Sequence, residues 1–180
     1  MIRVLPALLL LLASSALSAP APDYYPRQPG TTWSYSSGET QVIAAPTTVR
    51  GVPVVPVGHQ YGGQTYTQDL LEYRPDGSVW LRGVKAGDRL TWYAAPLNVY
   101  PPGPLRPGQR WQSGGGTLKS SSQVVGSEPV RVPAGTFNAL VIRTDLMVGG
   151  RQSTQLTSFV PGIGVVRYQT ADGSRIDLLK

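Results

Sequence analysis

The side chain best suited to acid–base or metal chemistry at neutral pH is His59, the only histidine in a chain that has no cysteine. Zinc, copper and non-haem iron sites take several His or Cys ligands, so the sequence predicts no such metal site and no cofactor. His59 lies close to Tyr61 and a Gly-Gly pair. This setting indicates a loop, in which the histidine is a hydrogen-bonded structural residue.

Nucleophilic and acid–base catalysis have equally few candidates. The chain contains no G-x-S-x-G or S-x-x-K motif, and a serine nucleophile would have His59 as its only base. The ten acidic residues are scattered, and Asp69 with Glu72 is one of several pairs that could serve a glycosidase on paper. We therefore expect no catalytic residue. A hydrolase would need acidic groups that converge in a cleft beside His59 or Tyr61.

Aromatic residues are the other candidates for binding a ligand: four tryptophans, nine tyrosines and two phenylalanines. Packing in a core and across strands accounts for most of them. Trp92, Tyr93, Tyr100 and Trp111 flank a proline-rich segment, and this placement suggests that they line one mouth of a curved sheet. Apolar ligands bind in such mouths.

The charge pattern argues against nucleic acid as a partner. The net charge is +6, but beyond Arg3 the arginines are spread from Arg27 to Arg175 without a run of three. Nucleic-acid binding needs a clustered basic patch. We expect no nucleic-acid partner.

The N-terminus has the order of a secretory signal peptide. Arg3 precedes an apolar run over 4–12, and the small residues Ala16 and Ser18 predict cleavage after residue 18. The run is too short for a transmembrane segment, which needs about 20 residues. A lipid anchor requires a cysteine after the signal, so we expect an exported protein without one, in the periplasm, the cell envelope or outside the cell.

Glycine and proline punctuate the rest of the chain too often for helices of normal length. Short alternating segments between turn signals predict a single all-β domain over 31–180, built as a strongly curved antiparallel sheet or incomplete β-barrel. Residues 19–30 hold four prolines and predict an extended N-terminal arm. Residues 94–109 hold five and predict a long crossover, because proline is excluded from central strands. Turn signals lie at Gly38 and over 74–77, 85–88, 149–150 and 171–173.

Several motifs resemble a known group of proteins. They are Tyr24-Tyr-Pro-Arg-Gln-Pro-Gly30, Gly108-Gln-Arg-Trp111, Val132-Pro-Ala-Gly-Thr-Phe137 and Pro161-Gly-Ile-Gly-Val-Val-Arg167. Together they resemble small secreted bacterial envelope proteins of unknown function, of the DUF3108-related type. The resemblance implies a half-barrel similar to the LolA and LolB lipoprotein carriers, and it implies no catalytic residues. This chain differs from the carriers in lacking a clear plug helix and from the lipoproteins in lacking the lipidated cysteine.

These observations favour a noncatalytic exported protein of the cell envelope. The leading hypothesis is a structural or interaction subunit that contacts another envelope protein. The alternative is a carrier that holds an apolar ligand or lipid in the concave face, and a hydrolase is the third. A carrier requires an open cavity of several hundred Å³. An interaction subunit predicts a concavity filled by the protein's own side chains and an apolar patch outside.

Overall fold

The computed structural model describes residues 24–180, which form thirteen β-strands and no helix. The predicted signal peptide and its cleavage site lie outside these residues. The all-β class expected from the sequence is confirmed, and no helix in the described part of the chain is long and apolar enough to cross a membrane. The strands are β1 (Thr32–Ser34), β2 (Glu39–Ile43), β3 (Thr47–Val49), β4 (Val52–Tyr61), β5 (Gln64–Tyr73), β6 (Val79–Ala86), β7 (Arg89–Tyr100), β8 (Arg110–Gly115), β9 (Leu118–Val132), β10 (Gly135–Val148), β11 (Arg151–Val160), β12 (Gly164–Thr170) and β13 (Arg175–Asp177).

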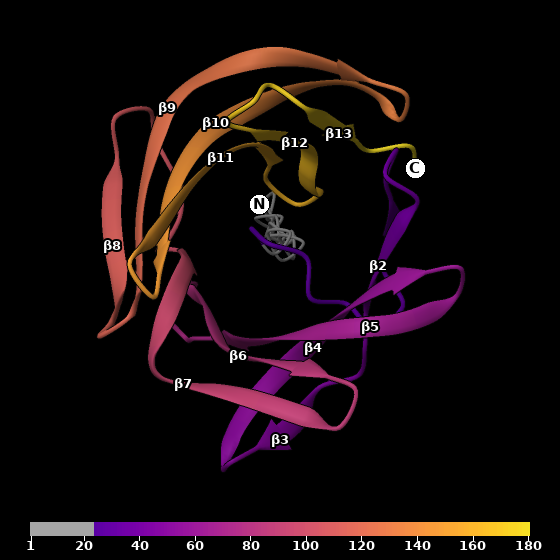
Figure 1. The fold of residues 1–180 in the computed structure, drawn as a ribbon. Coiled ribbons are helices and arrows are strands. Elements are labelled where there is room, and N and C mark those ends of the chain that lie inside the picture. The colour runs from indigo at the N-terminus through magenta and orange to yellow at the C-terminus, as the bar shows by residue number, and fades with distance from the viewer. Residues whose placement is uncertain (1–23) are drawn as a thin grey trace, which may run out of the picture.

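The strands form two antiparallel sheets that follow the chain in order. The first sheet has seven strands in the order β1-β2-β4-β5-β6-β7, with β3 paired to β4 beside this path. The second has six strands in the order β13-β12-β11-β10-β9-β8. Both sheets are curved and neither closes into a barrel, but together they surround a common interior (Figure 1).

Turns predicted from the sequence join neighbouring strands. Two of them share an Asp-Gly-Ser triplet in which the aspartate side chain accepts the serine backbone N–H. The Asp76 carboxylate lies 2.9 Å from the N–H of Ser78, and Asp172 lies 3.0 Å from that of Ser174. Gly77, between Asp76 and Ser78, adopts a φ of 83°, which residues other than glycine rarely adopt. These contacts are local, so the turns form from nearby sequence alone.

Backbone contacts hold the two sheets together along one side. Tyr35, after β1, forms a bridge with Leu178, after β13. Ser34 lies beside them, donating its N–H to Lys180 at 3.0 Å and accepting from Leu179 at 2.8 Å. On the other side the Asn98 N–H of β7 donates to the Ser113 Oγ of β8 at 2.7 Å. The first and last strands of the chain therefore meet.

The described part of the N-terminal arm lies between the sheets and not on their surface (Figure 1). Tyr25 is half-buried and packs against the core, with its ring centroid 5.0 Å from that of Tyr100 and 6.3 Å from that of Phe159. Tyr24 packs on Phe159 at 5.5 Å, and Tyr100 stacks on the same ring at 4.5 Å. This aromatic cluster joins the arm to both sheets and fills one end of the interior.

The crossover expected over 94–109 is shorter than predicted, because residues 94–100 belong to β7. The pairing of β6 with β7 jumps from Gly83↔Trp92 to Leu81↔Leu97, so residues 93–96 bulge out of the ladder. Pro96 lies in this bulge, where its missing N–H removes no ladder hydrogen bond. The proline-rich loop between strands covers only residues 101–109.

Candidate functional site

A cavity of about 280 Å³ lies between the two sheets, beside the aromatic cluster. Tyr25 and Tyr100 line the part nearest that cluster, and the partly exposed Asp69 lines the part nearest solvent. The wall combines apolar and hydrogen-bonding side chains. Its lining residues are Tyr25, Gln41, Val57, His59, Asp69, Leu71, Leu81, Leu97, Asn98, Val99, Tyr100, Ser120, Ser122, Ile142, Thr144, Leu146, Gln155, Thr157, Val165 and Tyr168.

The polar end of the cavity is built on three neighbouring strands of the first sheet. Gln41 of β2 pairs with His59 of β4, and Asp69 of β5 pairs with Val57, two residues before His59. Side chains two residues apart in a strand share a face. Gln41, His59 and Asp69 therefore all face the interior.

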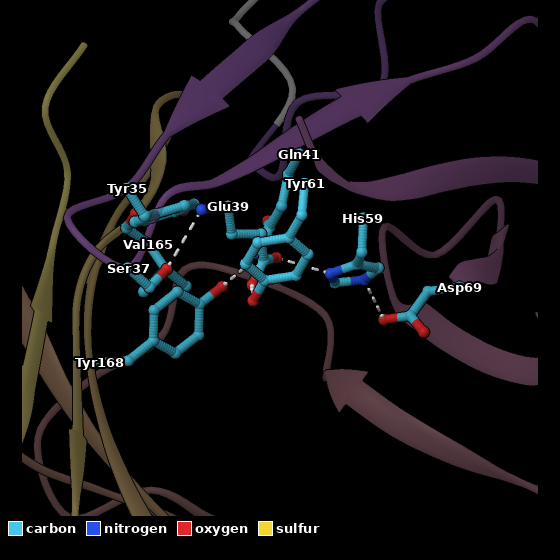
Figure 2. Close-up of polar contacts among 9 residues, drawn as sticks. All are labelled: Tyr35, Ser37, Glu39, Gln41, His59, Tyr61, Asp69, Val165 and Tyr168. Atoms are coloured by element: carbon cyan, nitrogen blue, oxygen red, sulfur yellow. Dashed lines mark hydrogen bonds and ion pairs between the residues drawn. The ribbon is translucent and has the colours of Figure 1, made fainter. Parts of the chain in front are cut away.

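Two carboxylates hold the imidazole of His59 from both sides (Figure 2). Its Nδ1 lies 2.7 Å from Glu39 Oε1, and its Nε2 lies 3.3 Å from Asp69 Oδ2. Glu39 also accepts hydrogen bonds from Gln41 Nε2 at 2.9 Å and from the Tyr61 hydroxyl at 3.0 Å. We call Glu39, Gln41, His59, Tyr61 and Asp69 the His59 cluster.

The contacts in the His59 cluster stabilise the charged forms of His59 and Glu39. Burial alone would lower the pKa of His59, but hydrogen bonds to Asp69 and Glu39 outweigh it and raise this pKa to about 10. The hydrogen bond from His59 lowers the pKa of Glu39 to about 2, against the opposing effect of burial. At neutral pH the cluster therefore contains an imidazolium beside the ionised carboxylate of Glu39.

This arrangement is poorly suited to acid–base catalysis. A general base needs a free ring nitrogen and a pKa near the working pH, whereas both nitrogens of His59 donate to carboxylates. Glu39 accepts three hydrogen bonds and stays ionised, so it has no proton to donate. No group of three or more His, Cys, Asp or Glu side chains in residues 24–180 is arranged to hold a metal ion.

The His59 cluster also reaches the second sheet. Gln41 Nε2 lies 3.4 Å from the hydroxyl of Tyr168 on β12. The Tyr168 ring packs edge-on against Tyr35 at 5.4 Å, and the Tyr35 hydroxyl donates to the carbonyl of Val165 at 2.9 Å (Figure 2). Burial raises the pKa of both tyrosines, so they remain neutral hydrogen-bonding groups.

Of the four aromatics expected to line a mouth, only Tyr100 lines the cavity. The Trp92 ring lies 5.2 Å from the guanidinium of Arg82, and the Trp111 indole N–H donates to the carbonyl of Asn98 at 3.0 Å. Tyr93 is half-buried, and burial together with the nearby Asp69 carboxylate raises its pKa. The structure therefore does not bring the four side chains together around one opening.

The sequence prediction missed most of the His59 cluster. His59 is a hydrogen-bonded histidine as expected, but it lies in strand β4 and not in a loop. The sequence did contain a usable signal. Glu39 directly follows the glycine turn at Gly38, and His59 and Asp69 lie on either side of the turn at Gly62-Gly63. Only the pairing of β2 with β4 and β5 places them together.

Comparison with known proteins supports the fold of the chain. No family model matches the sequence, and no curated protein matches it. A solved structure from Bacteroides fragilis, of a protein proposed to be exported and with a YmcC-like fold, superposes with a TM-score of 0.51. The match covers 89% of this chain and 99% of that one at 15% identity. At that identity the likeness shows the fold alone. It agrees with a small exported protein, while the DUF3108-related and Lol-like resemblance stays a prediction.

Proposed function

We propose that this protein is a noncatalytic exported binding protein, which holds a small, partly apolar ligand in the cavity between its sheets. The cavity itself is the observation that carries the proposal. At about 280 Å³ it is near the lower limit of small-molecule sites, which span about 300–1,000 Å³. A ligand of modest size fits this volume better than a complete lipid.

The composition of the wall indicates an amphipathic ligand. Leu71, Leu81, Ile142 and Leu146 offer apolar contacts from both sheets, and polar side chains such as Gln155 lie among them. Small-molecule sites commonly combine a mostly apolar wall with a few polar groups that orient the ligand. Here such groups come from both sheets, with Gln41, His59 and Asp69 on the first and Ser122 and Thr144 on the second.

The other roles considered from the sequence fit the interior less well. An interaction subunit predicts a completely filled concavity, whereas the aromatic cluster fills one end only. A hydrolase predicts acids converging beside His59, and Glu39 and Asp69 do converge there. However, both are hydrogen-bonded to the histidine itself, which leaves it no free nitrogen to act as a base.

Binding of a neutral fluorescent probe tests the proposal. We expect mature protein to bind N-phenyl-1-naphthylamine saturably at one site, and Leu146→Trp to weaken this binding at least tenfold by filling the cavity. Val125→Trp adds the same side chain at an exposed position and should bind as the wild type does. Absence of saturable binding to the wild type, or equal binding by both variants, would contradict the proposal.

A further inference from the structure

Exposed apolar side chains gather on two hairpins of the molecule. On the β4–β5 hairpin Tyr61 and Tyr66 are 41% and 56% exposed, and on the β10–β11 hairpin Met147 and Val148 are 39% and 52% exposed. They are four of the seven large apolar side chains that are exposed in residues 24–180. Such a concentration on the surface of a folded domain indicates an interaction site.

Both hairpins lie at the end of the molecule where the cavity has its polar part. In antiparallel sheets alternate turns lie at the same end. The cavity wall contains His59, near the β4–β5 turn, and Leu146, near the β10–β11 turn. The Gly149 N–H also donates to the Thr117 carbonyl at 2.8 Å, which places the β8–β9 and β10–β11 turns side by side. We call this end of the molecule the hairpin rim.

The exposed charges on the hairpin rim are mostly positive. Within two residues of their turns, the β6–β7, β8–β9, β10–β11 and β12–β13 hairpins carry five exposed basic side chains and two exposed acidic ones. Both acidic residues, Asp88 and Asp172, lie in turns. The basic residues are Lys85, Arg89, Lys119, Arg151 and Arg175.

We propose that the hairpin rim docks onto an anionic lipid surface. Apolar side chains on hairpin tips can enter the region between headgroups and acyl chains, while basic residues around them are attracted to the anionic headgroups. The apolar tips belong to one hairpin of each sheet, so a planar partner can contact both at once. The docking proposal rests on the hairpin rim and not on the ligand proposed for the cavity, so either proposal can fail without the other.

Cosedimentation with vesicles tests the docking. We expect mature protein to bind phosphatidylglycerol vesicles and to bind phosphatidylcholine vesicles much less, with binding weakened by salt. The double variant Met147→Ser with Val148→Ser should bind about tenfold less, because it removes the apolar tips. Lys119→Glu should weaken binding by about fivefold or more, as expected for one lost basic contact.

Ile163→Ser is the matched control, since Ile163 is 37% exposed in the β11–β12 turn at the opposite end. It should bind vesicles as the wild type does. Docking is overturned if the wild type does not bind phosphatidylglycerol vesicles, or if Met147 and Val148 variants bind no worse than the Ile163 variant. Probe binding measured without vesicles should be unchanged in the rim variants, which separates this result from the test of the cavity.

Discussion

The charge on His59 should make the stability of the fold depend on pH. In the folded protein the pKa of His59 is about 10, compared with an ordinary value of 6.5. A group with a raised folded-state pKa stabilises the fold fully below its unfolded pKa, and this contribution is lost as the pH rises through the folded value. We therefore predict a loss of stability between about pH 7 and pH 10.

The size of the effect follows from the proton linkage. Where the folded state binds one proton more than the unfolded state, stability falls by about 1.36 kcal/mol per pH unit, which gives an upper limit of about 2.5 kcal/mol between pH 7 and 9. The side chains of His59 and Asp69 are 23% and 35% exposed. Solvent screening at such exposure reduces the expected loss to about 1 to 2 kcal/mol.

Urea unfolding followed by tryptophan fluorescence at pH 7, 8 and 9 measures this loss. His59→Gln removes the titrating group and should lose less than half as much stability over the same range. In Asp69→Asn, His59 keeps its contact with Glu39, so the loss of stability with pH should lie between those of the wild type and His59→Gln. This variant keeps the prediction testable if His59→Gln does not fold. Measurements stop at pH 9 because burial raises the pKa of Tyr25 and Tyr100, so tyrosine ionisation adds a further loss near pH 10. Equal losses in the wild type and both variants would refute the reasoning.

Two further predictions concern the interior and the sheet. Tyr25→Ala removes a ring that contacts four other aromatic side chains. We expect it to lower the free energy of unfolding by about 3–5 kcal/mol, measured by urea titration. A loss below about 1 kcal/mol would show that the arm does not support the fold. Gly83→Ala would place a Cβ atom against the backbone carbonyl of Thr91, so it should cost about 2 kcal/mol or more, measured as a lower unfolding midpoint. Gly126→Ala meets no atom within 4 Å and should change stability by less than about 0.5 kcal/mol; similar effects of the two glycine variants would contradict the close approach of β6 and β7.

The sequence predicted the features that depend on neighbouring residues. The Asp-Gly-Ser turns at Asp76 and Asp172 form from contacts two residues apart, so their hairpins could be placed without knowledge of the rest of the chain. The error over 94–100 came from applying the rule against proline in strands to the whole segment. One bulge around Pro96 was sufficient to keep the strand continuous.

The site could not be predicted in the same way, because it depends on pairing between distant segments. Glu39, His59 and Asp69 are separated by turns and other residues, and only the register of three strands brings their side chains together. Likewise, nothing near Tyr25 in the sequence indicates that it packs on Tyr100 and Phe159, which belong to different sheets. The arm, which the sequence predicted as an extended segment, is part of the core.

The contact between the beginning and the end of the domain affects when the fold can be completed. Besides their partners in β2 and its turn, Ser34 and Tyr35 have backbone partners in residues 178–180. During synthesis or export, this edge of β1 stays exposed until residues 178–180 have been delivered, and contacts of such long sequence separation also form slowly. A chain that is cut short would keep this edge unpaired and open to association with other strands. Residues 178–180 therefore protect one edge of the first sheet from association with other molecules.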